Sequence, residues 1–285
     1  MPVRIVTDST CDLPPEVIVE HRIAVVPLYI NFGAESYLDG VDLTRDQFYA
    51  RLPASHLPPT TSAPGTAAFV QVYQRLIAEG ATGIVSIHIG SSLSNVFNVA
   101  QVAAPAITAV PVRVVDGGQI TLGTGFLVVH AARLAASGAA PDEIVASVQA
   151  LAAHTHSFAA LDTLEYLRRG GRVNLLTFSV GTLLKMKPML KMHAGKVVTD
   201  RARTSKGAID RLVNLALQLG PLESVALVHA ATPARLELLC QEVHSRLPGV
   251  PILMVGEVTP VIGAHVGPGA IGLVCLQATS QAARS

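Results

Sequence analysis

Short, continuous apolar runs alternate with helical patterns along most of the chain, and this alternation limits the possible folds more than any other feature. The runs read "VRIVT", "IAVVPLYI", "GIVSIHIG", "VPVRVVDG", "SVALVHAA", "PILMVGEV" and "IGLVCL". A strand that is apolar at every position, rather than at every second one, is typical of a central strand covered by helices on both faces. The pattern predicts an α/β protein with mainly parallel sheets flanked by helices.

The predicted helices have recognisable ends. Thr44 and Gln47 have the spacing of a capping box, and Gly80 and Gly138 stand where C-terminal glycines belong. A helix predicted over 233–246 opens with the dipeptide Thr-Pro, which suits a first helical turn. These signals support the division into alternating strands and helices.

The length of 285 residues leaves room for two α/β domains. The alternation breaks after residue 155, where short helices and a hairpin turning at "HAG" are predicted. We therefore expect an N-terminal domain over 1–155 and a C-terminal domain over 156–285, and the last strand, at about 270–280, can pack with either. A crevice between two α/β domains is a common place for a ligand.

The composition argues against several classes of partner. Only 14% of the residues are charged and the formal net charge is +1, so we expect no nucleic-acid partner. Cys11, Cys240 and Cys275 lie far apart without CxxC spacing, which indicates neither a disulfide framework nor a zinc site. The first residues lack the features of a signal peptide, and every apolar run is broken before membrane-spanning length. We expect a cytoplasmic protein without integral membrane association.

Four loops at strand ends or helix starts are rich in Gly, Ser and Thr: "TDST", "TTSAPG", "GSSLSN" and "DGGQITLGTG". In a parallel α/β sheet such loops converge on the ligand crevice, where helix N-termini favour anions. Each loop alone is also explained by residues that merely cap helices. Their coincidence favours a site in which hydroxyls and backbone N–H groups hold one anionic head group.

Catalytic signatures are weak in this sequence. No loop contains GxSxG, and His88, a base near "GSSLSN", lies within a strand-like run that is typical of a core histidine. The glycines of "GGQITLGTG" lack the GxGxxG spacing of a dinucleotide site. His154 and His156 form an HxH pair without a third metal ligand at a telling spacing. We assign no catalytic residue, metal or cofactor, and keep a serine hydrolase or nucleotide-dependent enzyme as the alternative.

The segment "YLRRGGR" places Arg168, Arg169 and Arg172 around two glycines. Arginines on a glycine-bent loop can clamp a phosphate group with paired hydrogen bonds. They can equally complement the dipole at the C-terminal end of the preceding helix. The segment alone leaves both interpretations open.

Taken in order, the motifs "VTDST", "TTSAP", "SSLS", "DGGQITLGTG", "LEYLRRGGR", "KPMLKMHAGKV", "RARTSKGA" and "HVGPGAIG" closely resemble the DegV family, over residues 6–273. The resemblance implies a two-domain α/β protein that buries one long-chain fatty acid between its domains. Related members are the binding subunit of bacterial fatty-acid kinase, and they present the carboxylate to a separate ATP-binding subunit that makes the acyl phosphate. The acyl carrier then has no ATP site or cofactor of its own.

The same resemblance assigns residues to the head group. Thr61 and Ser62 of "TTSAP" and Ser94 of "SSLS" would hold the carboxylate, with His265 of "HVGPG" close to it. The hydroxyl-rich loop "PPTTSAPG" has no acid, base or cysteine, which suits a site that orients a carboxylate and leaves the reaction to a partner.

Arg169 and Arg172 would assist phosphoryl transfer or docking of the kinase subunit. The sequence departs from the family's usual pattern at Gly65, at Gly117 and at "NVF" over 95–97. A fatty-acid carrier without a kinase partner is therefore a further possibility.

Overall fold

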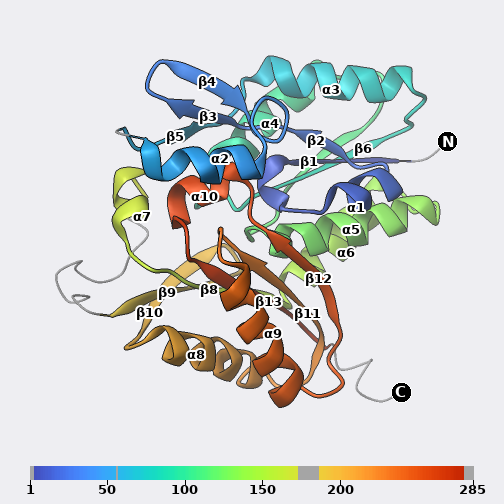
Figure 1. The fold of residues 1–285 in the computed structure, drawn as a ribbon. Helices are drawn as coiled ribbons and strands as arrows, with labels where there is room; N and C mark the ends of the chain where they lie inside the picture. Colours follow the sequence, from blue (N-terminus) through green and yellow to red (C-terminus); the bar gives the residue numbers. More distant parts are fainter. Residues whose placement is uncertain (1–2, 56, 173–185, 279–285) are drawn as a thin grey trace.

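The computed structural model describes residues 3–55, 57–172 and 186–278, and it confirms the α/β class (Figure 1). The first sheet has the strand order β2 (Ala24–Val26), β1 (Arg4–Asp8), β6 (Ile84–His88) and β7 (Val112–Asp116). All its pairings are parallel, as the sequence predicts. Helices α3 (Thr66–Ala78) and α4 (Val96–Ala103) pack on one face, and α5 (Leu122–Ala136) and α6 (Pro141–Ala152) on the other.

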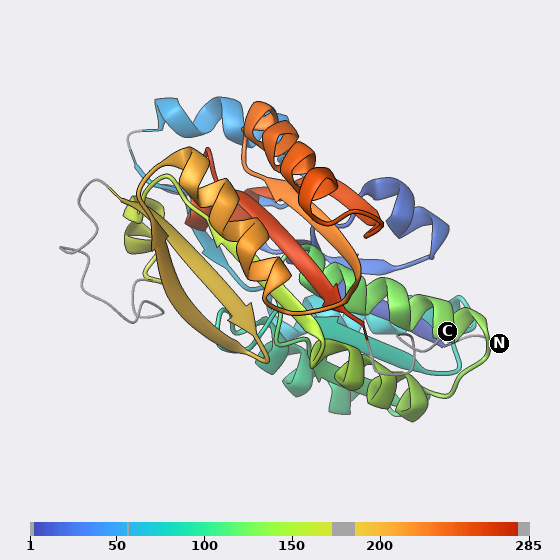
Figure 2. The ribbon, with the colours of Figure 1, turned by 90° about the horizontal axis from the view of Figure 1, so that it is seen from below.

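The second sheet has six strands in the order β10 (Lys196–Ala202), β9 (Lys187–His193), β8 (Thr155–Ala160), β13 (Ile271–Gln277), β11 (Leu222–His229) and β12 (Ile252–Glu257). Helices α8 (Ser205–Leu217) and α9 (Pro233–Arg246) cover its outer face (Figure 2). A compact apolar cluster that includes Leu212, Leu227 and Leu273 fills the space between these helices and the sheet.

The expectation of mainly parallel sheets needs a correction in this second sheet. Only β11 and β12 pair in parallel, and the other four pairings are antiparallel. The connections explain the difference: β9 and β10 are joined by a two-residue turn at Ala194 and Gly195, which forces antiparallel pairing, whereas α9 links β11 to β12. The hairpin predicted at "HAG" is thereby confirmed.

A third, antiparallel sheet has the order β4 (Glu35–Leu38), β3 (Tyr29–Phe32) and β5 (Thr60–Ser62), and it lies beside α2 (Arg45–Arg51). The run "IAVVPLYI", which reads as one strand in the sequence, is divided between β2 and β3 in different sheets. The break falls at Pro27 and Leu28, since proline has no N–H to continue a ladder.

Helix α5 lies between the two large sheets. It packs on β1 and β6 of the first sheet and on β8, β11 and β13 of the second. Because both sheets cover this helix, most of α5 is buried and apolar, and only Arg133 and Ala136 near its C-terminal end are exposed. A single apolar core continues past α5 from one sheet to the other.

The remaining helices are α1 (Pro15–Glu20), α7 (Glu165–Arg169), α10 (Pro260–Val266) and the short 3₁₀ helices η1 (Ser9–Cys11), η2 (Leu52–Ala54) and η3 (Ala104–Ala106). Although α10 lies near the end of the chain, it packs against η1, α2, β3 and β5. The last strand, β13, lies between β8 and β11 in the six-stranded sheet. A domain division near residue 155 stays a prediction, and Thr155 is the first residue of β8.

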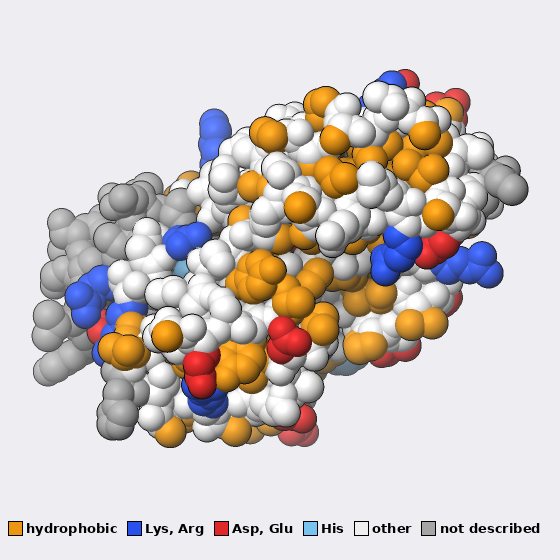
Figure 3. All heavy atoms as spheres, turned by 90° about the horizontal axis from the view of Figure 1, so that it is seen from above, with side chains coloured by type: hydrophobic (Ala, Val, Ile, Leu, Met, Phe, Trp, Pro, Cys, Tyr) orange, Lys and Arg blue, Asp and Glu red, His pale blue; other side chains and the backbone are white. Residues whose placement is uncertain are grey.

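The predicted helix ends agree with the structure. Thr44 and Gln47 form a reciprocal capping box at the start of α2. Gly80 and Gly138 follow α3 and α5 with φ of 93° and 91°, which a glycine adopts without steric cost. Seen from above, the surface carries few charged side chains, in line with the low charged fraction (Figure 3). None of the described helices is long and apolar enough to cross a membrane.

Candidate functional site

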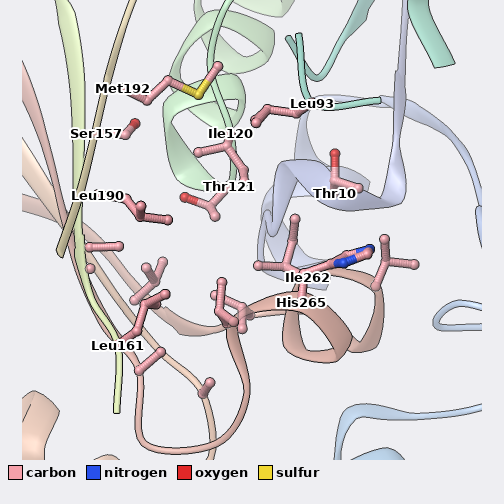
Figure 4. Close-up of a pocket in the computed structure, with 18 of the residues that line it drawn as sticks. Thr10, Leu93, Ile120, Thr121, Ser157, Leu161, Leu190, Met192, Ile262 and His265 are labelled. Carbon is pink, nitrogen blue, oxygen red and sulfur yellow. The ribbon is translucent and has the colours of Figure 1, made fainter. Parts of the chain in front are cut away.

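A largely apolar pocket lies between α10 and the inner face of the six-stranded sheet (Figure 4). The sheet contributes Phe158, Ala159, Leu190, Met192, Val228, Ile271 and Val274. Helix α10 and the loops of the first and third sheets contribute Leu28, Ile89, Leu93, Ile120, Val261, Ile262 and Val266. The pocket is therefore built from residues distributed over most of the chain, and its walls suit an apolar ligand.

Four of the six residues singled out in the sequence line this pocket: Thr61, Ser94, Arg172 and His265. The hydroxyl oxygen of Thr61 lies 2.7 Å from Nε2 of His265, across 204 residues of sequence. Ser62 does not line the pocket and is exposed, because side chains alternate along β5 and its neighbour Thr61 takes the inward position.

His265 occupies an environment that keeps its ring neutral. Burial lowers its pKa to about 4, and the positive charge of Arg172 lowers it further. Its Nδ1 has no hydrogen-bond partner among the described residues and faces Gly170. A Cβ at Gly170 would lie 2.3 Å from Nδ1, so the glycine in "RRGGR" is what lets this loop approach the imidazole.

The two arginines assigned to one role in the sequence have different surroundings. Arg172 lines the pocket, and its Nη1 donates to the carbonyl oxygen of Gly170 at 2.8 Å. Arg169 is exposed, and its Nε donates to Glu165 at 2.6 Å. The structure therefore brings Arg172, and not Arg169, to the end of the pocket that holds Thr61 and His265.

The loops "GSSLSN" and "DGGQITLGTG" form one hydrogen-bonded unit. Asp116 accepts hydrogen bonds from the backbone N–H groups of Ser91 at 3.1 Å and Gly118 at 2.9 Å. The carbonyl oxygen of Gly118 in turn accepts from Gly195 N–H, 3.0 Å away in the β9–β10 turn. Asp116, which the sequence analysis did not single out, thus holds the loop that carries Ser94.

The structure shows the surroundings of the three positions at which the sequence departs from the family's usual pattern. Gly65 is the residue before α3, and a Cβ there would meet nothing within 4 Å. At Gly117 a Cβ would come within 2.7 Å of the carbonyl oxygen of His88, so a larger residue would displace the backbone. Residues 95–97 open α4, where Val96 is fully buried.

Helix α10, which carries His265, is anchored at its start by the buried carboxyl group of Asp12. The backbone N–H of Thr259 donates to Asp12 at 2.8 Å. Asp39 is also buried near this helix start, but neither of its carboxyl oxygens has a hydrogen-bond partner among the described residues. Burial raises the pKa values of Asp12 and Asp39 to about 7 in each case.

A Ser-His-Asp arrangement exists, but it is sealed in the core. Oγ of Ser86 lies 2.7 Å from Nε2 of His88, and Nδ1 of the same ring lies 2.9 Å from Asp8. None of the three side chains is exposed, and Tyr73 donates to Ser86. Burial alone would raise the pKa of Asp8, but the hydrogen bonds to it bring the pKa below its usual value. No substrate reaches this serine, so the arrangement does not support a hydrolase.

One histidine of the HxH pair, His156, packs against another ring in the structure. His156 stacks on His193, with ring centroids 3.9 Å apart and planes 6° from parallel. Burial and the neighbouring His193 lower the pKa of His156 to about 4, which keeps the ring of His156 uncharged near neutral pH. Within the described ranges, no cluster of three or more His, Cys, Asp or Glu side chains is arranged to hold a metal ion.

These observations define an α/β protein built around a buried apolar pocket with a polar end. A family model described as "Uncharacterised protein, DegV family" matches residues 2–278. A DegV domain-containing protein of Streptomyces coelicolor is 38% identical over 275 residues, which cover 95% of this chain and 97% of the relative. The chain belongs to the DegV family.

Solved structures of the same fold come from several bacteria. A fatty-acid-binding DegV family protein of Thermus thermophilus has a TM-score of 0.87 and 30% identity, covering 98% of this chain and 100% of its own. DegV of Bacillus subtilis, described as a fatty acid binding protein, has the same TM-score and identity over 97% and 100%. A stearic acid-binding protein of Eubacterium ventriosum matches at a TM-score of 0.86 and 25% identity, over 96% and 98%.

Proposed function

We propose that this protein binds one long-chain fatty acid in the pocket and presents its carboxylate to a separate, ATP-dependent kinase subunit. The observation that carries the proposal is an apolar pocket that ends at the Thr61 and His265 pair, with Arg172 close to His265 and Ser94 lining the same pocket. Ser62 is exposed, so the proposed carboxylate site omits it. Similar proteins are described as binding fatty acids, and apolar walls of this kind suit an acyl chain.

The energetics divide between tail and head group. Burying about fifteen methylene groups, at roughly 0.8 kcal/mol each, stabilises the complex by on the order of 12 kcal/mol before association costs. Hydrogen bonds to the charged head group contribute roughly 1.5–3 kcal/mol each. The tail therefore sets the affinity, and the hydroxyl, imidazole and guanidinium groups set the direction in which the ligand lies.

The kinase step is proposed because the pocket's polar end orients a carboxylate without attacking it. A neutral imidazole and two hydroxyls provide hydrogen bonds, and the Ser-His-Asp arrangement is out of reach. Phosphorylation then depends on ATP and charge neutralisation brought by a partner, with Arg169 exposed beside the site. We place this activity in the cytoplasm, and a carrier without a kinase partner is the second possibility.

Extraction of the purified protein into organic solvent, followed by mass spectrometry, tests the first part. A co-purified fatty acid is expected, and binding measured along an acyl series should strengthen with each methylene until the pocket is full. Absence of lipid together with a flat response to chain length would refute fatty-acid binding. Formation of acyl phosphate with a cognate kinase subunit and ATP, trapped as the hydroxamate, tests the second part; binding without any acyl phosphate would leave a carrier.

A further inference from the structure

The pocket wall contains polar side chains that the proposed carboxylate site does not use. Thr10 is occupied, since its hydroxyl hydrogen-bonds to Asp8. His229 is also engaged, because its Nδ1 accepts a backbone N–H at 3.2 Å. Thr121 differs: its side chain is 8% exposed, it lines the pocket, and its hydroxyl has no hydrogen-bond partner within the described ranges. A hydroxyl of this kind is open to the pocket and can hydrogen-bond to a ligand there.

Thr121 precedes α5 and adopts φ 53° and ψ −140°, a conformation that β-branched residues rarely adopt. Threonine is a favoured N-cap residue, yet this side chain makes no capping hydrogen bond. Instead the hydroxyl is turned into the pocket, on the side of Leu190 (Figure 4). The positive end of a 15-residue helix dipole lies directly behind it.

Ser157, in strand β8, supplies the complementary group, and it also lines the pocket. The side chain of Gln119 has a fixed orientation, because its Nε2 donates to the carbonyl oxygen of Thr155 at 2.7 Å. Its Oε1 therefore faces Ser157, whose hydroxyl must donate to it at 2.9 Å. The oxygen of Ser157 can then only accept from a ligand, while Thr121 has a proton to donate.

Ser157 also lies against the start of α5. A Cβ at Gly123 would come within 2.5 Å of its Oγ, which places this oxygen beside the first turn of the helix that Thr121 precedes. A hydroxyl that can donate and a hydroxyl oxygen that can accept thus both belong to a wall that is otherwise apolar in this part of the pocket. A ligand hydroxyl satisfies both groups, whereas a methylene satisfies neither.

We propose that Thr121 and Ser157 form a polar subsite for a hydroxyl group on the acyl chain, so that a hydroxylated fatty acid is the preferred ligand. The inference rests on the proposed function, since it places the same ligand in the same pocket. A hydroxyl at the matching carbon gains hydrogen bonds, and at other carbons it is buried against aliphatic side chains without a partner.

The test compares octadecanoic acid with a positional series of monohydroxyoctadecanoic acids, on full-length protein freed of lipid with a hydrophobic resin. Affinities are measured by displacement of a fluorescent fatty acid. One position is expected to bind on the order of fivefold more tightly than octadecanoic acid, with weaker binding at the other positions. Thr121→Val and Ser157→Ala should each remove this preference while octadecanoic acid still binds.

Thr124→Val is the matched control. Thr124 lies in the next turn of α5, its hydroxyl is buried without a partner among the described residues, and it does not line the pocket. This variant should keep the preference. The subsite is refuted if octadecanoic acid binds and no hydroxylated position exceeds it, or if the preference survives in both pocket variants. If neither octadecanoic acid nor any hydroxylated acid binds to the wild-type protein, the proposed function itself fails.

Discussion

At the scale of single residues, the polar end of the pocket depends on His265 being neutral. Burial and the nearby Arg172 both disfavour its protonation, and Thr61 holds its Nε2. Because the imidazole is neutral, the positive charge of Arg172 is not balanced by it or repelled by it. A negatively charged ligand group is therefore stabilised at this position. The site is thus polarised for an anion before any ligand arrives.

Ligand binding should therefore raise the pKa of His265. The negative charge of a carboxylate stabilises the imidazolium form, so the pKa moves from about 4 towards its ordinary value. NMR titration of ring-labelled histidine, with and without fatty acid, measures this. His130, which bonds to Ser147 outside the pocket, is the internal control and should not move. An unchanged or lower pKa for His265 would contradict a carboxylate beside its ring.

Substitutions of Arg172 and Arg169 should have different effects on the affinity for fatty acid. Arg172→Ala removes a cation from the pocket and should weaken fatty-acid binding about tenfold or more, as expected for a charge-assisted hydrogen bond. Arg169→Ala removes an exposed partner of Glu165 and should change the affinity less than about twofold. Titration of both variants with the same fluorescent fatty acid measures the two affinities. Equal losses would place Arg169 in the pocket too.

At the scale of elements, the polar end is assembled by close contact between the loop after α7 and α10. Gly170 approaches the ring of His265, and at Gly267, where φ is 72°, a Cβ would meet the ring of Tyr166 at 2.1 Å. Such contacts exclude any side chain at either glycine. The glycines of "RRGGR" and "HVGPG" thus serve packing between two elements as well as the bending of each loop.

Gly170→Ala should weaken fatty-acid binding by displacing His265 from Thr61, because the added Cβ would lie 2.3 Å from Nδ1. The neighbouring Gly171→Ala is the matched control. Gly171 has φ of 70° and open space around it, so alanine there costs about 1 kcal/mol in backbone strain without touching the ring. Thermal unfolding and ligand titration are measured on both. Normal affinity in Gly170→Ala would show that the ring tolerates the methyl group.

Sequence patterns predicted the elements better than their arrangement. The parallel sheet, the hairpin at "HAG" and the capping box of Thr44 are local signals, and they are confirmed. The antiparallel pairing of β13 and the inward choice of Thr61 over Ser62 depend on partners far along the chain. The buried pairing of Asp8 with His88 was missed, although both residues end neighbouring parallel strands. Ser94 and His265 were assigned to the head group through the resemblance to the DegV family. The spacing of residues in the sequence alone did not identify them.

At the scale of the whole molecule, buried ionisable side chains make the free energy of unfolding depend on pH in two opposing ways. The pKa values of His265 and His156 are lowered to about 4, so their contribution is present above about 6.5 and is lost as the pH falls towards 4. The pKa values of Asp12 and Asp39 are raised to about 7, so their contribution is present below about 4 and is lost as the pH rises through 7.

Asp39→Asn should therefore gain stability relative to the wild-type protein as the pH rises. The variant has no carboxylate to bury, so between pH 5 and pH 8 the difference in unfolding free energy should shift in its favour by about 2 kcal/mol. Denaturant unfolding at both pH values measures the shift. Asp142→Asn, at an exposed ion pair with Arg113, is the control and should show little change. A difference independent of pH would mean that Asp39 is already charged in the native state at pH 5.

The contact between Thr61 and His265 joins residues 204 positions apart, and the helix that brings the imidazole is followed only by β13 among the described elements. During synthesis, the hydroxyl end of the pocket leaves the ribosome long before its imidazole partner. A nascent or prematurely terminated chain can bury apolar surface but cannot hold a carboxylate in place. Under the proposed function, a fatty acid is therefore expected to bind only after the chain has been synthesised through α10.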